Sequence, residues 1–201
     1  QADSMHEALA AAFEGRFDEA ERTELGIFYR SDFGRYVTEI ESAIQAMSAE
    51  EQLAARDEGI AILEDLPADA TRVGQIDEIM VLVSAEVGQT MLGQALRAMM
   101  ASMALAGATG DIEVPWEEID AQVAQMLPGL KQEVAATQRA LMAYAYRDLS
   151  DAELERYIAF LRTDVAMKFY AVLGYSVGTI MESAMSEFGR ELAYRLNRVN
   201  V

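Results

Sequence analysis

Apolar residues recur every three or four positions along almost the whole chain, and this spacing restricts the available folds most strongly. No segment shows the strict apolar–polar alternation of a half-buried strand. Ala, Leu, Met, Glu and Gln, which favour helices, are plentiful. With 201 residues and no Cys, the chain is long enough to bury a core without disulfides. The sequence therefore predicts an all-α protein, a globular multi-helix bundle.

Capping boxes mark three helix starts. In this motif a side-chain acceptor caps the first backbone N–H groups, and a Glu three residues later bonds back to the cap residue. The pattern occurs at Asp18–Glu21, Ser48–Glu51 and Ser150–Glu153. Pro128 and the Gly after it predict a break between two further helices. The predicted helices are 4–15, 19–30, 32–46, 49–65, 73–107, 115–127, 130–147, 151–162 and 164–197.

Residues 73–107 are predicted to form one long, apolar helix at the centre of the bundle. Its apolar side chains cover most of its circumference: Met91, Leu92, Ala95, Leu96, Met99, Met100 and Met103. Its polar side chains form a narrow stripe: Glu86, Gln89, Thr90, Gln94 and Arg97. A helix this apolar must be covered on most sides, so we expect other helices to pack on it. Gly88 and Gly93 are expected at close helix crossings.

Met is frequent, with 12 residues, and three interpretations of it remain open. Met fills irregular gaps in cores, which is the favoured interpretation, and it also lines adaptable binding grooves. In the second case Met91, Met99, Met100 and Met103 form an apolar groove for a ligand or partner. Paired thioethers also bind Cu(I), but we predict no metal site.

Two segments resemble each other without a gap. Residues 8–37 read ALAAAFEGRFDEAERTELGIFYRSDFGRYV and residues 140–169 read ALMAYAYRDLSDAELERYIAFLRTDVAMKF. Because predicted caps align with predicted caps, the sequence indicates a duplicated helix–turn–helix unit. This gives an N-terminal helical unit over 1–66 with the first copy. The long central helix and the second copy fall in 67–201, and the two parts are expected to form one compact domain.

Each copy has a break between its two helices with the same chemistry. Arg30 and Asp32 flank Ser31 in the first copy, and Arg162 and Asp164 flank Thr163 in the second. The hydroxyl residue suits an N-cap, and the Asp lies in the first turn near the positive end of the helix dipole. We therefore interpret both as structural turns. A polar interaction site that occurs twice is the alternative.

The second copy also carries a family signature between Tyr144 and Leu173. Its matching residues are Ser150, Glu153, Leu154, Phe160, Thr163 and Lys168, and in the first copy Phe28, Tyr29, Ser31 and Gly34 match the turn more closely. These segments resemble a bacterial family known as domain of unknown function 2059. Asp32 and Asp164 stand where that pattern has Pro. The resemblance implies an all-helical, exported protein with no established activity, and it provides no catalytic residue to carry over.

The charge balance excludes several classes of partner. The chain has 16 basic and 34 acidic residues, a net charge of −18 at pH 7. Nucleic acid and anionic membrane surfaces repel such a chain. The longest uncharged stretch, residues 98–110, is shorter than the ~20 residues of a membrane-spanning helix. The start Gln1-Ala2-Asp3 is what signal-peptide removal or an expression boundary would leave. With the resemblance, we expect a periplasmic or secreted protein.

Catalytic motifs are incomplete. Gly174–Gly178 spells a nucleophile elbow around Ser176, but that chemistry needs a preceding strand and a His, and the only His is His6. Residues 88–94 have the glycine spacing of a phosphate loop without its Lys. The sequence therefore predicts no cofactor and a non-catalytic protein that engages a protein partner or an apolar ligand. A serine hydrolase using Ser176 and a helical carrier of small apolar molecules are the alternatives. A homo-oligomer is compatible with the sequence.

Overall fold

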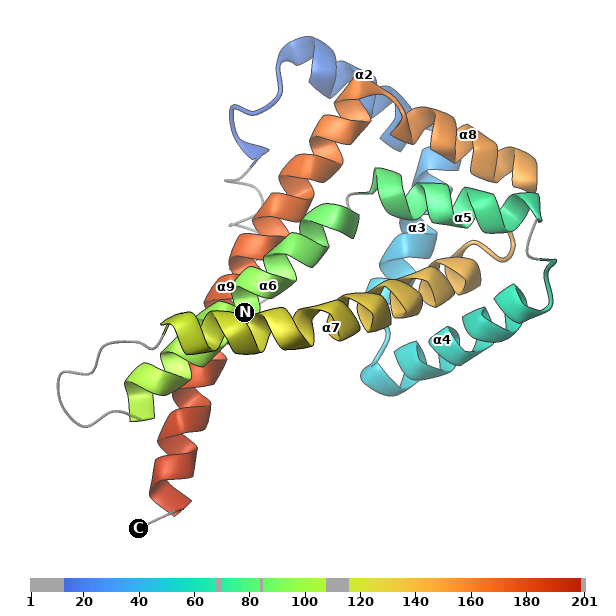
Figure 1. Ribbon diagram of the computed structural model, residues 1–201. Coiled ribbons are helices and arrows are strands. Elements are labelled where there is room, and N and C mark those ends of the chain that lie inside the picture. The colour runs from blue at the N-terminus through green and yellow to red at the C-terminus, as the bar shows by residue number, and fades with distance from the viewer. Residues whose placement is uncertain (1–12, 68–69, 84, 108–115, 200–201) are drawn as a thin grey trace. The chain divides into compact units, whose positions relative to one another are not determined.

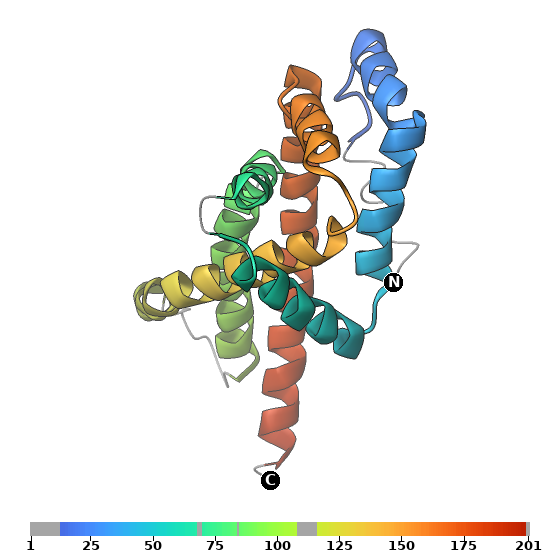
Figure 2. The same ribbon diagram turned by 90° about the vertical axis from the view of Figure 1, so that its right-hand side faces the viewer.

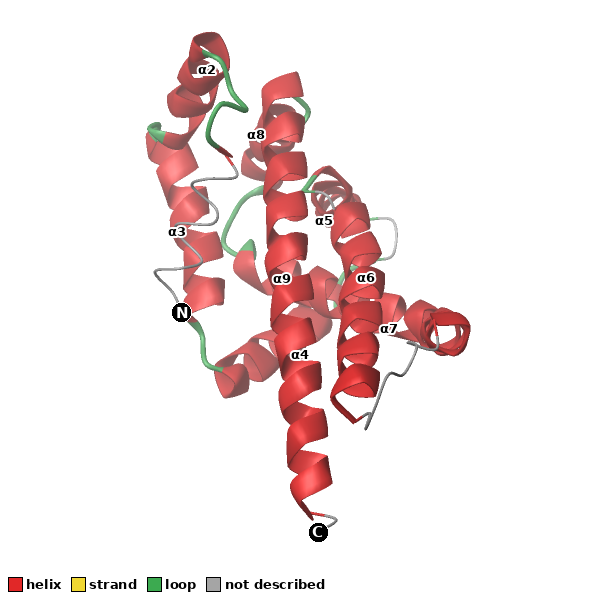
Figure 3. Ribbon diagram, turned by 90° about the vertical axis from the view of Figure 1, so that its left-hand side faces the viewer, coloured by secondary structure: helices red, strands yellow, loops and turns green. Residues whose placement is uncertain are grey.

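The computed structural model describes residues 13–67, 70–83, 85–107 and 116–199, and all structural statements refer to these (Figure 1). Every regular element among them is an α-helix, and no strand occurs in these ranges (Figure 3). The predicted all-α class is therefore confirmed. No helix in the described ranges is long and apolar enough to cross a membrane.

Eight helices are described. They are α2 (Glu19–Tyr29), α3 (Asp32–Ala46), α4 (Ala49–Glu64), α5 (Thr71–Leu82), α6 (Ala85–Gly107), α7 (Trp116–Ala145), α8 (Asp151–Leu161) and α9 (Asp164–Val199). The predicted helix 4–15 lies almost wholly outside the described residues. The three capping boxes are present at the starts of α2, α4 and α8. At α8 the Ser150 hydroxyl accepts the Glu153 N–H at 3.3 Å, and the Glu153 carboxylate accepts the Ser150 N–H at 2.8 Å.

The prediction of one helix over 73–107 is wrong. Helix α5 ends at Leu82, and its C-cap Val83 has φ −81° and ψ 17°, outside the helical conformation. Helix α6 begins at Ala85. The apolar spacing continues across this break without Gly or Pro, so no helix-breaking residue marks a stop. The two helices pack in different compact units, and this tertiary packing sets the break.

The predicted break at Pro128 is also wrong, because α7 runs through it. An interior Pro costs a helix about 3 kcal/mol. Val123 before it and Ala140 after it are each 1% exposed, so both halves of α7 are held by packing. Burial on both sides outweighs the local cost of the proline.

The chain forms two compact units from separated segments. Unit 1 consists of residues 1–12, 86–132 and 172–201, and unit 2 of residues 13–85 and 133–171. The sequence organisation places a boundary at residue 66, whereas α7 and α9 each contribute to both units. Each unit is described separately.

The core of unit 2 is aromatic and aliphatic. Its fully buried side chains include Val37, Ile76, Ile79, Leu149, Leu154, Tyr157, Ile158 and Leu161. The rings of Phe28 and Phe160 stack with centroids 3.6 Å apart and planes 3° apart. A Cβ added to Gly59 would lie 1.9 Å from the Ala140 carbonyl oxygen, so α4 crosses α7 in close backbone contact.

The core of unit 1 is built on α6, α7 and α9. Leu96, Ala101, Ile119 and Val123 form its buried cluster, with Leu92, Met99, Met100, Leu127, Leu130 and Met185 packed against it. Helices α6 and α9 lie side by side (Figures 1 and 3). A Cβ on Gly178 would meet Met91 Cγ at 2.1 Å, and one on Gly189 would meet the Met99 carbonyl oxygen at 2.3 Å. These glycines of α9 permit the close approach of α6.

The predicted glycine crossings on α6 have a mixed outcome. A Cβ on Gly93 would lie 3.1 Å from Leu127 Cδ2, which places Gly93 against a side chain of α7. The surroundings of Gly88 lie outside the described residues. The polar stripe is described only at Gln94, which is exposed, and at Arg97, which is half-buried.

Candidate functional site

The first of the two predicted turns links α2 to α3 (Figure 2). Arg30 is the C-cap of α2, and its N–H donates to the Gly26 and Phe28 carbonyls. The Ser31 hydroxyl accepts the Gly34 N–H at 3.0 Å and donates to the Phe28 carbonyl at 2.6 Å. Asp32 begins α3 and forms an ion pair with Arg35. The hydroxyl therefore caps α3, as the structural interpretation expects.

The second turn has the same backbone design. Arg162 is the C-cap of α8 with φ −73° and ψ −9°, close to the −89° and −10° of the first turn. The Thr163 hydroxyl accepts the Ala166 N–H at 3.3 Å, and Asp164 begins α9. Both turns therefore have the predicted helix-break structure.

The two arginines differ in what their side chains contact. Arg162 donates from Nε to Glu78 Oε1 of α5 at 2.8 Å and pairs with Glu155 at 3.4 Å. The Arg30 guanidinium instead folds back over Gly26, since a Cβ there would lie 3.7 Å from its Cζ. No ion pair of Arg30 occurs within the described part of the chain. The arginine side chain of the first turn is thus exposed, whereas that of the second turn forms ion pairs.

Arg30 borders a shallow, open groove of about 630 Å³ along α2. Its lining residues, named here the α2 face, are Glu19, Arg22, Thr23, Gly26, Ile27, Arg30 and Ser31. Ile27 in this face is 71% exposed. The α2 face is a surface of unit 2 that sequence reasoning did not single out beyond Arg30 and Ser31.

A second groove, named here the α6–α9 groove, lies in unit 1 and has a volume of about 580 Å³. It is lined by Met91, Gln94, Arg97, Ala98, Ala101, Ser102, Trp116, Tyr175, Thr179, Glu182 and Ser186. Trp116 and Tyr175 are 52% and 61% exposed. Arg97 forms an ion pair with Asp120 of α7. The groove therefore combines two exposed aromatic rings with six polar or charged side chains.

The four methionines predicted as an apolar groove are divided by the structure. All are half-buried, and Met91 lines the α6–α9 groove while packing on Gly178. Met99 and Met100 pack against the unit 1 core instead. The groove proposed from the sequence thus retains Met91 and gains Trp116 and Tyr175, which no helical spacing links to it.

Ser176 lies inside α9, with no strand before it among the described residues. It is 7% exposed, and its hydroxyl donates to the Val172 carbonyl one turn earlier at 2.7 Å. A nucleophile elbow requires the hydroxyl to project from a sharp strand-to-helix turn. His6 lies outside the described residues. The residues of the elbow motif therefore form part of an ordinary α-helix.

A buried hydroxyl cluster in unit 2 was missed by sequence reasoning. Glu41 Oε1 accepts the hydroxyls of Tyr146 at 2.6 Å and Tyr157 at 2.7 Å. The Tyr157 hydroxyl lies 2.9 Å from that of Tyr170, which accepts the Tyr29 hydroxyl at 3.4 Å. Helices α2, α3, α8 and α9 and the turn after α7 thus converge on one carboxylate.

Burial dominates the electrostatics of this cluster. It raises the pKa of Tyr146 and of Tyr157 well above 10, so both phenols remain protonated donors at neutral pH. Burial also raises the pKa of Glu41, while the two phenol hydrogen bonds lower it. Each phenol is satisfied within the cluster, which therefore serves to specify the packing of unit 2.

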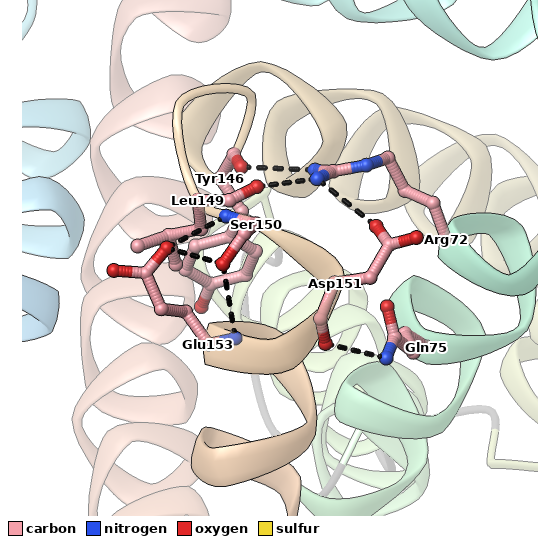
Figure 4. A network of polar contacts seen from close by, with 7 residues as sticks. All are labelled: Arg72, Gln75, Tyr146, Leu149, Ser150, Asp151 and Glu153. Carbon is pink, nitrogen blue, oxygen red and sulfur yellow. Dashed lines mark hydrogen bonds and ion pairs between the residues drawn. The ribbon is translucent and has the colours of Figure 1, made fainter.

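The start of α8 is held by a polar network (Figure 4). Arg72 of α5 donates to the Tyr146 carbonyl at 3.1 Å and to the Leu149 carbonyl, and pairs with Asp151 at 3.1 Å. Gln75 Nε2 donates to the Asp151 carbonyl at 2.9 Å. This network joins α5 to α8. Neither the network nor the rest of the described chain contains a group of three or more His, Cys, Asp or Glu side chains that could hold a metal ion.

Comparison with known proteins gives one finding. Residues 3–61 match the model of a bacterial family described as an uncharacterized protein conserved in bacteria, domain of unknown function 2059. The predicted resemblance is thereby confirmed for the segment that contains α2, α3 and most of α4. The similar segment from Tyr144 to Leu173 lies outside the matched residues. No curated protein and no solved structure matches the chain.

Proposed function

We propose that this protein is a non-catalytic, exported helical protein that binds an apolar ligand, or an apolar segment of a protein partner, in the α6–α9 groove. One observation carries the proposal: two exposed aromatic rings, Trp116 and Tyr175, border a groove that Met91 also lines. Exposed aromatic side chains gathered around one concavity mark interaction sites more often than isolated exposed residues do.

The dimensions and chemistry of the groove suit such a ligand. Its volume of about 580 Å³ lies within the range of small-molecule sites, which is about 300–1,000 Å³. Met91 adapts its shape easily, as methionines at promiscuous binding surfaces do. Polar side chains of the lining would orient the polar end of such a ligand: Gln94, Arg97, Ser102, Thr179, Glu182 and Ser186.

The non-catalytic part of the proposal is supported by the geometry of Ser176. Its hydroxyl is bonded to the Val172 carbonyl inside a helix, so it is neither exposed nor activated. Incubation with a fluorophosphonate probe tests the alternative hydrolase. No labelling is expected, and labelling that Ser176→Ala removes would overturn this part.

The export part of the proposal is supported by the resemblance to the bacterial family. It is tested by expressing the complete gene in a Gram-negative bacterium and releasing the periplasm by osmotic shock. We expect the protein in the shock fluid or the medium. Retention with a cytoplasmic marker enzyme would contradict export.

Ligand binding is tested with N-phenyl-1-naphthylamine, an uncharged apolar dye. Trp116 is the only Trp in the chain, so energy transfer from it to the dye reports binding next to the groove. We expect saturable transfer for the wild type. Ala98→Arg places a long charged side chain in the groove and should weaken dye binding at least about tenfold.

The matched control is Gln125→Arg, which adds the same charge at an exposed position of α7 in unit 1. It should leave dye binding unchanged. Equal loss in both variants, or no saturable transfer in the wild type, would overturn the groove as a binding site. For the carrier alternative, native mass spectrometry of protein purified from bacteria should show a bound small molecule that the Ala98→Arg variant lacks.

A further inference from the structure

The lining of the α6–α9 groove contains two charged side chains, Arg97 and Glu182. Arg97 of α6 forms an ion pair with Asp120 of α7, and its Nε donates to Asp120 Oδ1. This pair neutralises the charge of the guanidinium. The net charge of the groove is therefore set by Glu182.

Glu182 of α9 has no such partner. It is exposed, and no ion pair or hydrogen bond joins its side chain to another residue in the described ranges. Its neighbours one turn away on α9 are all uncharged: Gly178, Thr179, Met185 and Ser186. The groove thus contains one carboxylate that the described part of the chain does not neutralise.

The apolar part of the groove begins on the same side of α9 as this carboxylate. Tyr175 precedes Glu182 by seven residues, so the two share one face of the helix and lie about 10 Å apart along its axis. Between them Gly178 packs against Met91, since a Cβ on Gly178 would meet Met91 Cγ at 2.1 Å. This side of the groove therefore passes from an exposed ring, past a thioether, to a carboxylate.

Trp116, at the start of α7, adds the second exposed ring of the lining. The faces of Trp and Tyr rings carry negative electrostatic potential, so they attract organic cations as well as apolar surfaces. The rings and the Glu182 carboxylate therefore favour the same type of ligand, which has an apolar body and a positively charged group.

We propose that the ligand of the α6–α9 groove is a small amphiphilic cation, in which an apolar chain or ring system ends in an ammonium group. The apolar part lies against Met91 and the two rings, and the ammonium group pairs with Glu182. The net charge of −18 attracts such a ligand to the protein and repels an anionic amphiphile. This inference rests on the proposed binding function of the groove and adds the charge of the ligand.

The test displaces N-phenyl-1-naphthylamine from the full chain with three compounds that share an octyl chain: octyltrimethylammonium, octanol and octanoate. Energy transfer from Trp116 reports how much dye remains bound. Because the cation adds an ion pair and contacts with ring faces, we expect it to displace the dye at a concentration about fivefold lower than octanol does. Octanoate should be the weakest of the three.

Glu182→Gln keeps the size of the side chain and removes its charge. It should reduce the preference for the cation over octanol to about twofold or less, while the dye itself binds with unchanged affinity. The matched control is Glu187→Gln, the same change at an exposed position on another face of α9. It should keep the wild-type preference, which excludes the change in net charge as the cause. Circular dichroism checks that both variants remain helical.

The outcomes separate this inference from the proposed function. Equal displacement by the cation and octanol, a preference that persists in Glu182→Gln, or equal losses in Glu182→Gln and Glu187→Gln would overturn the cationic ligand and leave the groove as a binding site. A preference for octanoate would also overturn it and would indicate that Arg97 binds the charged group. Without saturable dye binding in the wild type, the proposed function fails, and this inference fails with it.

Discussion

Helices α2 and α8 share their length and caps but differ in burial. In α8 four residues are buried, Leu154, Tyr157, Ile158 and Leu161, whereas in α2 only Leu25 is buried among the helix residues. The capping boxes and the turns after each helix are nevertheless the same. The comparison teaches that contacts within three or four residues set the local structure, and the remaining positions decide what packs on it.

The two segments also meet each other. The stacked rings of Phe28 and Phe160 stand at corresponding positions of the similar segments, so like contacts like, as in an isologous interface. This contact fits a duplicated unit. That the two backbones superpose over 13–37 and 145–169 stays a prediction.

Substitutions at Gly34 and at its counterpart Ala166 are expected to differ most in their effect on the free energy of unfolding. A Cβ on Gly34 would lie 2.0 Å from the Phe28 carbonyl oxygen, whereas the second turn holds an Ala there, fully buried. Gly34→Ala should therefore lower the free energy of unfolding by about 3 kcal/mol through overpacking. Ala166→Gly should cost about 1 kcal/mol. Urea unfolding followed by circular dichroism measures both.

Equal costs at these two positions would break the comparison, because the first turn would then tolerate a Cβ as the second does.

An intermediate effect is expected for the arginines that hold the two helix starts. The Arg72 side chain is 17% exposed and bonds two carbonyls, whereas Arg22 is 59% exposed and bonds one. Arg72→Met should lower the free energy of unfolding by about 2 kcal/mol, since it leaves buried carbonyls unpaired. Arg22→Met should cost less than about 1 kcal/mol, as exposed ion pairs do. Similar costs would mean that the contacts of Arg72 do not hold α5 against the start of α8.

The smallest effect concerns the capping-box glutamates and depends on pH. The hydrogen bond from Lys168 is the main cause that lowers the pKa of Glu21, and the Ser150 hydroxyl is the main cause that lowers the pKa of Glu153. A carboxylate whose pKa is lowered in the folded state stabilises the protein at pH values above 4.5, which is the usual pKa of the group. This stabilisation disappears as pH falls through the folded-state pKa.

Glu21→Gln should therefore lower the melting temperature slightly more than Glu153→Gln at pH 7, because it also loses the Lys168 pair. The difference should vanish at acidic pH, where both wild-type carboxyls are protonated. Melting curves across this pH range measure it, and a difference that persists at low pH would show that the Lys168 contact is not the cause.

Much of the fold was readable because its signals are local. The starts of α2, α4 and α8 rest on hydrogen bonds between residues three positions apart, and the turn residues Ser31 and Thr163 cap within the same distance. Such contacts involve side chains that are neighbours in the printed sequence. The all-α class follows from the same short-range spacing.

The candidate sites were readable only in part. Met91 and Arg30 were singled out, but Trp116, Tyr175 and Ile27 were not, because neither groove is a property of one sequence motif. The Glu41 cluster joins residues 105 and 116 positions apart, and no periodicity links them. The frequency of Tyr, with 8 residues, is the one signal that could have pointed to it.

The sequence by itself determined where most helices begin, how the two turns are capped and that the protein is helical, because each depends on bonds within one helical turn. Tertiary structure alone decided that the chain breaks after Leu82 and continues through Pro128. The break after Leu82 lies between helices packed in different units, and α7 is buried on both sides of its proline. In both places the free energy of burying side chains against distant segments exceeds the local preference of the backbone.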